Sequence, residues 1–196
     1  MKANLIWAFL GLSFTFFGCQ SGKVQQKLSD AEEALLLRQG DSVALAAQQV
    51  LMQNLTQAIK IKGIADAVSF CNLNAISLTD STAKSYGLGI QRLSEKNRNP
   101  QNALSLAADK AAWEKMRQLL SDTSVQTKHF ISNEQEGVFY YKAINIAMPT
   151  CLSCHGQPGL EISEQVLSTI QQKYPDDKAT GYKMNDFRGM WKLALR

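Results

Sequence analysis

The sequence predicts an α+β fold, with helices in the first part of the chain and an antiparallel sheet after them. Residues 41–60 and 64–78 place apolar side chains every three or four positions, which is the period of one helical face. Residues 127–132 and 138–147 are instead rich in β-branched and aromatic side chains, and a polar segment ending in glycine separates them. This pattern predicts N-terminal helices that pack on an antiparallel sheet.

Residues typical of helix ends mark where the first helix begins and ends. Asp41 follows Gly40 and can cap the first helix, and Gly63 can end it. On the second helix, residues spaced by four, four and three share one face: Ala67, Cys71, Ala75 and Leu78. Cys71 is therefore expected to face inward between small neighbours.

The rest of the chain alternates between the two types of element. We expect an extended segment with a turn at residues 86–93 and a helix at 107–120. We expect a short helix at 163–174 and a terminal strand or hairpin at 187–195. Pro149 is expected to end the second strand of the hairpin, so that residues 151–155 lie in a loop after the sheet.

The most specific motif is Cys-x-x-Cys-His at residues 151–155, the attachment sequence of a c-type haem. The thiols of Cys151 and Cys154 can each form a thioether with one haem vinyl group, and His155 can then place an imidazole nitrogen on the iron. We therefore expect one covalent haem c, with His155 as an axial ligand.

Other interpretations of the motif remain open: coincidence, a disulfide or redox pair, or half of a zinc site. A zinc site needs two further Cys or His ligands at suitable spacing, and the candidates Cys71 and His129 lie far apart in the sequence. A thioredoxin-like pair would be expected beside a strand-helix-strand pattern, which this region lacks.

Residues 1–18 are typical of an export signal. Lys2 supplies a positive charge, and the apolar run that follows is shorter than the roughly 20 residues of a transmembrane helix. The run ends in Gly18-Cys19, which resembles a bacterial lipoprotein signal in which Cys19 becomes the lipidated first residue. Plain cleavage or an uncleaved anchor is the alternative.

Export and haem attachment support each other, because bacterial c-type haems are attached outside the cytoplasmic membrane. We expect residues 19–40 to tether the lipid to a single haem domain at residues 41–196, on the periplasmic side of a bacterial membrane. The chain has 196 residues and a formal charge of +4, which argues against nucleic acid as a partner. A redox or signalling protein is the expected partner, and a homodimer is a further option.

One cysteine is left over in this scheme. With Cys19 lipidated and Cys151 and Cys154 bonded to haem, Cys71 stays unpaired in a compartment where free thiols are generally oxidised. It is either a small buried residue, as free cysteines often are, or a ligand to the iron.

A polar loop at residues 92–100 carries Arg92, Lys96 and Arg98. Charged loops are usually solvated. The alternative is that Arg92 or Arg98 pairs with the haem propionates, since guanidinium suits carboxylate geometry.

The second axial ligand could be an imidazole, a thioether or a thiolate. His129 is the remaining histidine, but it lies on an expected strand, where a lone histidine is more often hydrogen bonded at the edge of a core. Met184 lies in the C-terminal segment, and Met148 is too near the attachment site to reach the opposite haem face.

Five segments occur in a distinctive order: Phe-Cys-Asn at 70–72, the loop from Arg92 to Arg-Asn-Pro-Gln-Asn at 98–102, Tyr-Tyr-Lys-Ala-Ile at 140–144, the haem motif, and Tyr-Pro-Asp-Asp-Lys-Ala-Thr-Gly-Tyr at 174–182. Together they resemble a bacterial family of monohaem c-type cytochromes with a PAS-like fold, long catalogued as a domain of unknown function. The resemblance covers the chain from about residue 41 to its end. It departs from the family at residues 185–186, which read Asn-Asp where the family has Gly-Asp.

The resemblance implies N-terminal helices packed on a PAS-like antiparallel sheet, and an iron held by His155 on one side and Cys71 on the other. A thiolate stabilises ferric iron and lowers the reduction potential. We therefore expect one of two functions. The first is low-potential electron transfer. The second is redox or gas sensing, in which Cys71 leaves the iron on reduction or on binding of a diatomic gas. A haem enzyme, peroxidase-like or acting on sulfur compounds, and a His/Met-ligated electron carrier are the alternatives. The chain shows no catalytic constellation beyond the haem, so we do not expect an enzyme.

Overall fold

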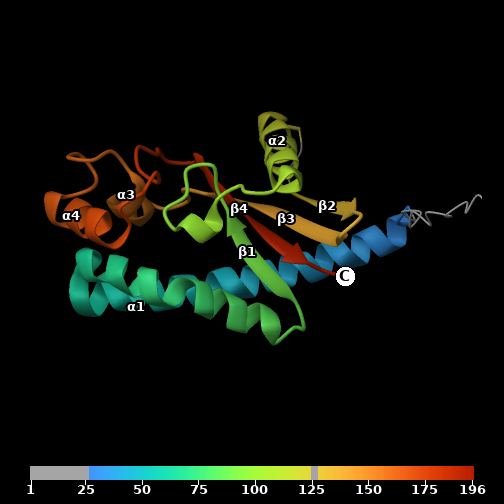
Figure 1. The fold of residues 1–196 in the computed structure, drawn as a ribbon, viewed down its shortest axis with the longest axis horizontal. Coiled ribbons are helices and arrows are strands. Elements are labelled where there is room, and N and C mark those ends of the chain that lie inside the picture. The colour runs from blue at the N-terminus through green and yellow to red at the C-terminus, as the bar shows by residue number, and fades with distance from the viewer. Residues whose placement is uncertain (1–26, 125–127) are drawn as a thin grey trace, which may run out of the picture.

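The computed structural model describes residues 27–124 and 128–196, and within them it has the expected α+β fold (Figure 1). The helices are α1 (Asp30–Lys84), α2 (Ala107–Ser121), α3 (Pro149–His155) and α4 (Glu164–Lys173), with a short 3₁₀ helix, η1 (Pro100–Asn102). The strands are β1 (Gly89–Leu93), β2 (His129–Glu134), β3 (Gly137–Asn145) and β4 (Phe187–Ala194), which form an antiparallel sheet in the order β1-β4-β3-β2. The export signal and Cys19 lie outside the described residues, and no helix within them is long and apolar enough to cross a membrane.

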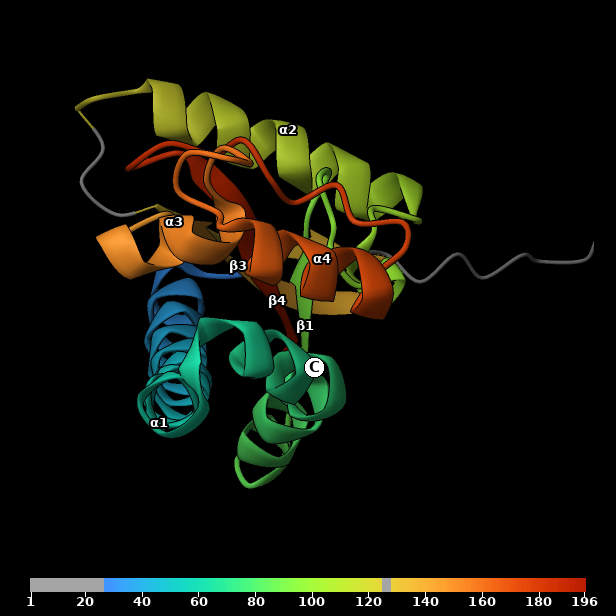
Figure 2. The ribbon, with the colours of Figure 1, turned by 90° about the vertical axis from the view of Figure 1, so that its left-hand side faces the viewer.

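Helix α1 is two antiparallel arms rather than one straight rod. Gly63 has φ 84° and ψ 174°, a left-handed conformation that glycine adopts without steric cost. Val43 and Leu51 of the first arm share a hydrophobic cluster with Ala83 and Ala75 of the second. Figure 2 shows the two arms side by side beneath the sheet. The predicted helix end at Gly63 is therefore confirmed, and the chain reverses there.

The predicted helix start at Asp41 is wrong, because α1 begins at Asp30. The side chain of Ser29 accepts a hydrogen bond from the Glu32 backbone, and the Glu32 carboxylate accepts one from the Ser29 backbone, which is a complete capping box. Part of the segment expected to be a tether is thus helical. The Asp41 carboxylate caps nothing and is instead hydrogen bonded to the side chains of the β2–β3 hairpin.

Gly40 lies inside α1 because the helix passes close to the ring of Tyr140 on β3. A Gly40→Ala substitution is expected to destabilise the protein, since overpacking costs about 1–3 kcal/mol and outweighs the roughly 1 kcal/mol that alanine gains in a helix. Chemical denaturation would measure the change in the free energy of unfolding. Gly89→Ala on β1 is the control, because a methyl group there meets nothing within 4 Å. A Gly40→Ala protein more stable than the wild type would contradict this packing.

The sheet is covered on both faces. Tyr140 and Tyr141 are successive residues of β3, so their side chains point to opposite faces. Tyr140 packs in the cluster formed with α1, and Tyr141 packs in a second cluster with Trp113 and Met116 of α2. A buried ion pair of 2.5 Å between Lys192 on β4 and Asp109 also anchors α2 to the sheet.

The haem-binding sequence was expected in a loop, and this is wrong. Residues 149–155 form α3, with Pro149 in its first turn, where proline suits a helix because its missing N–H has no helical partner. The predicted hairpin, the helix at 107–120, the helix at 163–174 and the terminal strand are confirmed as β2–β3, α2, α4 and β4. Asn185 adopts φ 69° in the turn before β4.

Candidate functional site

The two motif cysteines project from α3 into different hydrophobic clusters. Cys154 packs against Val68 on the second arm of α1 and against the apolar face of α4. Cys151 packs against Ile146 and Tyr182. Both are partly buried free thiols, as is Cys71. Burial raises the pKa of Cys154 to about 11, aided by Cys71 and Cys151 and opposed by Arg98, so the thiol does not resemble a low-pKa catalytic cysteine.

His155 is held in one tautomer by a hydrogen bond to the backbone. Its Nδ1 lies 2.8 Å from the carbonyl oxygen of Ala179. A carbonyl only accepts, so Nδ1 carries the hydrogen and Nε2 keeps its lone pair. Burial, and then the charges of Arg188 and Arg98, hold the pKa of His155 well below its usual value. The result is a neutral imidazole with Nε2 available, which is the form that binds a metal.

Residues 174–182, here called the strap, fix the position of α3. Asp177 accepts hydrogen bonds from Nε of Arg98 at 2.9 Å and from the backbone of Ala179 at 3.1 Å. Arg98 also donates to the carbonyl oxygens of Cys154 at 2.6 Å and Ala179 at 3.3 Å. The backbone N–H of Tyr182 donates to the carbonyl of His155. The strap therefore supplies the acceptor for His155 and is itself held by one ion pair.

The Arg98–Asp177 pair is buried, with side chains only 12% and 8% exposed. Asp177→Ala would leave the guanidinium without its counter-charge, and we expect a loss of about 3–5 kcal/mol in the free energy of unfolding. Urea denaturation would measure it. Asp176→Ala, at the exposed neighbour, is the control and should stay within about 0.5 kcal/mol of the wild type. Equal stability of the two variants would refute the structural role of the pair.

Arginines from three elements surround His155: Arg92 on β1, Arg98 in the loop before η1, and Arg188 at the start of β4. Burial lowers the pKa of Arg188 to about 10, with Arg98 and Arg92 adding to the shift against the opposing effect of Tyr182. Of these three arginines, only Arg98 has a carboxylate partner among the described residues. Arg92 contacts the ring of Trp191, and Nε of Arg188 is buried without a hydrogen bond. The site thus concentrates positive charge that calls for an anionic group.

Cys71 lies on the second arm of α1 within electrostatic reach of the same groups. Burial raises the pKa of its thiol, and the charges of Arg92 and Arg98 oppose that rise. Its neighbour Asn72 donates a hydrogen bond to the carbonyl of Lys173, which ties this arm to the end of α4. The fold therefore gathers Cys71 with residues that lie far from it in the sequence.

The other candidate ligands are placed differently. His129 lies on β2, where Nδ1 is 3.0 Å from the carboxylate of Asp41 and the ring meets Tyr140 edge-on. This is the hydrogen-bonded setting expected of a lone strand histidine. Met184 and Met148 are 39% and 43% exposed. In the described part of the chain, no three His, Cys, Asp or Glu side chains cluster to hold a metal ion by themselves.

Two residues of the site were missed at the sequence level. Arg188 reaches the site because β4 pairs with β1, which carries Arg92, and no local signal reports that pairing. Tyr182 stands edge-on to His155 with ring centroids 6.2 Å apart. It is the last residue of the segment at 174–182, so the resemblance marked its position without assigning it a role.

The residues present fit a c-type haem. Its two vinyl groups match two free thiols three positions apart. Its iron matches a neutral histidine with Nε2 available, and its propionates match buried arginines without carboxylate partners. The model of a family described as Tll0287-like matches residues 23–195. The chain is also similar to the crystal structure of the cyanobacterial heme-protein Tll0287, at 25% identity and a TM-score of 0.48, covering 78% of this chain and 94% of that one. No curated protein matches the chain.

Proposed function

The chain belongs to the Tll0287-like family, and on that premise we propose that it is an exported, membrane-anchored monohaem c-type cytochrome. The family expected from the five sequence segments is confirmed by this match. Tll0287, after which the family is described, is a cyanobacterial heme-protein, which supports haem as the cofactor. The observation that carries the proposal is the hydrogen bond from Nδ1 of His155 to Ala179, which leaves Nε2 available beside the attachment cysteines.

Each residue has a role in this proposal. Cys151 and Cys154 would hold the haem covalently, and His155 and Cys71 would bind its iron. The haem, when bound, supplies a reversible one-electron change at iron. Arg92 and Arg188 pair with the propionates, while Arg98 acts mainly through the strap because its guanidinium is already bonded to Asp177.

We propose low-potential redox or gas sensing, or electron transfer, as the activity. A thiolate from Cys71 would lower the reduction potential. The proposal includes lipidation at Cys19 on the periplasmic side, a protein partner and a diatomic gas as a candidate ligand. It assigns no catalysis, since His129, the other histidine for acid-base chemistry, is engaged with Asp41.

Absorption and resonance Raman spectra of both oxidation states test the sensing proposal. We expect a six-coordinate ferric haem that loses Cys71 on reduction and then binds carbon monoxide. A low-spin six-coordinate spectrum that neither reduction nor carbon monoxide changes would contradict ligand exchange and would favour electron transfer alone.

A further inference from the structure

A cavity of about 370 Å³ lies between α2 and the segment that leads into β4. None of the three motif residues or Cys71 lines it. Its volume falls within the roughly 300–1,000 Å³ typical of small-molecule sites. Residues from α2, the strap, β4 and the loop after β1 contribute to its wall, so a bound molecule would contact elements that are far apart in the sequence.

Aromatic rings form much of the wall. Trp113 of α2 and Phe187 of β4 are stacked, with ring centroids 4.3 Å apart. Tyr182 of the strap supplies a third ring. Trp113 and Tyr182 are 5% and 7% exposed, so only a small part of each ring is open to a ligand. Such walls suit a planar aromatic group, which gains from stacked and edge-on ring contacts.

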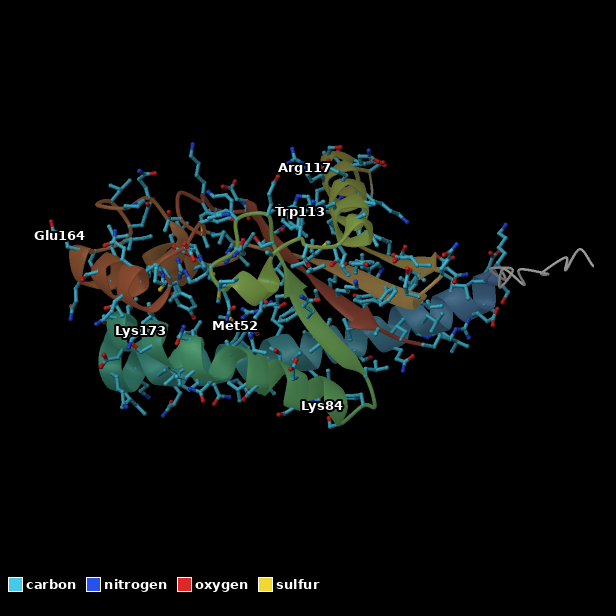
Figure 3. All side chains as sticks on the ribbon, viewed as in Figure 1. Met52, Lys84, Trp113, Arg117, Glu164 and Lys173 are labelled. Carbon is cyan, nitrogen blue, oxygen red and sulfur yellow. The ribbon has the colours of Figure 1, made fainter. Side chains whose placement is uncertain are left out.

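Charges line the same cavity. Lys96 and Arg117 contribute two cations and Glu95 contributes one carboxylate. Arg117 lies 3.7 Å from Glu95, and both side chains are more than half exposed, so this ion pair is weak and a ligand can compete for the guanidinium. Nζ of Lys96 stands over the ring of Tyr182 at 4.4 Å. Trp113 and Arg117 both belong to α2, one turn apart (Figure 3).

We propose that this cavity binds a small planar aromatic carboxylate, with its ring against Trp113, Phe187 and Tyr182 and its carboxylate at Arg117 and Lys96. Arginine binds carboxylates through parallel hydrogen bonds, which gives the site a preference for the anion over a neutral amide of the same shape. None of the proposed haem ligands lines this cavity, although its wall residue Tyr182 lies edge-on to His155. The proposal does not depend on the proposed function.

Isothermal titration calorimetry of the full chain with 2-naphthoate tests the proposal. We expect 2-naphthoate to bind at least about tenfold more tightly than 2-naphthamide or cyclohexanecarboxylate. Arg117→Gln should weaken binding by about tenfold. Lys110→Gln, which removes an exposed cation of α2 outside the cavity, should leave the affinity unchanged.

The titration is repeated on protein with and without covalent haem. Equal affinity in the two forms supports a separate site. Loss of binding when haem is attached would show that the cavity is part of the haem pocket and would overturn the proposal. Absence of binding at millimolar 2-naphthoate would also overturn it, as would an equal loss of affinity in Arg117→Gln and Lys110→Gln. A chain that fails to attach haem can still be titrated, so failure of the haem proposal is distinguished from failure of this one.

Discussion

Replacing Cys151 and Cys154 together with alanine is expected to abolish covalent haem attachment completely. Each thiol forms one of the two thioethers, and no other cysteine of the described residues lies on α3. Haem staining of a denaturing gel measures the covalent bond directly, because non-covalent haem is lost on denaturation. Both substitutions only shorten partly buried side chains, so the fold should persist.

Cys71→Ala is the matched control for that experiment. It removes a thiol from the same site, and it leaves both thioether positions intact. We expect its haem to stay on the denatured chain. Haem staining of the Cys151→Ala/Cys154→Ala protein at the wild-type level would refute the assignment of the motif.

Replacing Cys71 with serine is expected to raise the reduction potential by about 0.1 V or more, because axial ligands set haem potentials over a range of about 0.8 V. The thiolate donates charge to the iron and stabilises the ferric state, and a serine hydroxyl does so far less. Spectroelectrochemical titration gives the potential, and the charge-transfer bands of ferric thiolate should disappear from the absorption spectrum.

The other candidate ligands supply the controls. His129→Gln and Met184→Leu should leave both the potential and the spectrum unchanged, because His129 is bonded to Asp41 and Met184 is substantially exposed. A wild-type spectrum in Cys71→Ser, together with an altered spectrum in either control, would transfer the second axial position to that residue.

Local signals in the sequence were reliable where the local conformation decides the structure. Gly63 ends the first arm of α1 because its backbone needs a positive φ. Ser163 caps α4 through its side chain, as the expected start at residue 163 requires. The β2–β3 hairpin follows from the β-branched and aromatic side chains of its two strands and from the polar segment, ending in Gly137, that separates them.

Tertiary contacts decided the features that sequence reasoning missed. Gly40 predicts a helix boundary, yet it lies within α1 because the ring of Tyr140 leaves no room for a side chain. Pro149 predicts the end of a strand, but proline equally suits the first turn of α3. Arg188 joins Arg92 only through the pairing of β4 with β1, which no short motif encodes. Haem attachment at the Cys-x-x-Cys-His motif could therefore be predicted from the sequence, but the presence of Arg188 near His155 could not.

Covalent attachment of haem to this chain can be measured by spectrum and mass together. The full chain is produced with a c-type maturation system, and its absorption spectrum and pyridine haemochrome are recorded with the mass of the denatured protein. We expect a Soret band, a c-type haemochrome and a mass increase of one haem per chain. A protein without a Soret band, or one that releases all its haem on denaturation, would contradict covalent haem attachment.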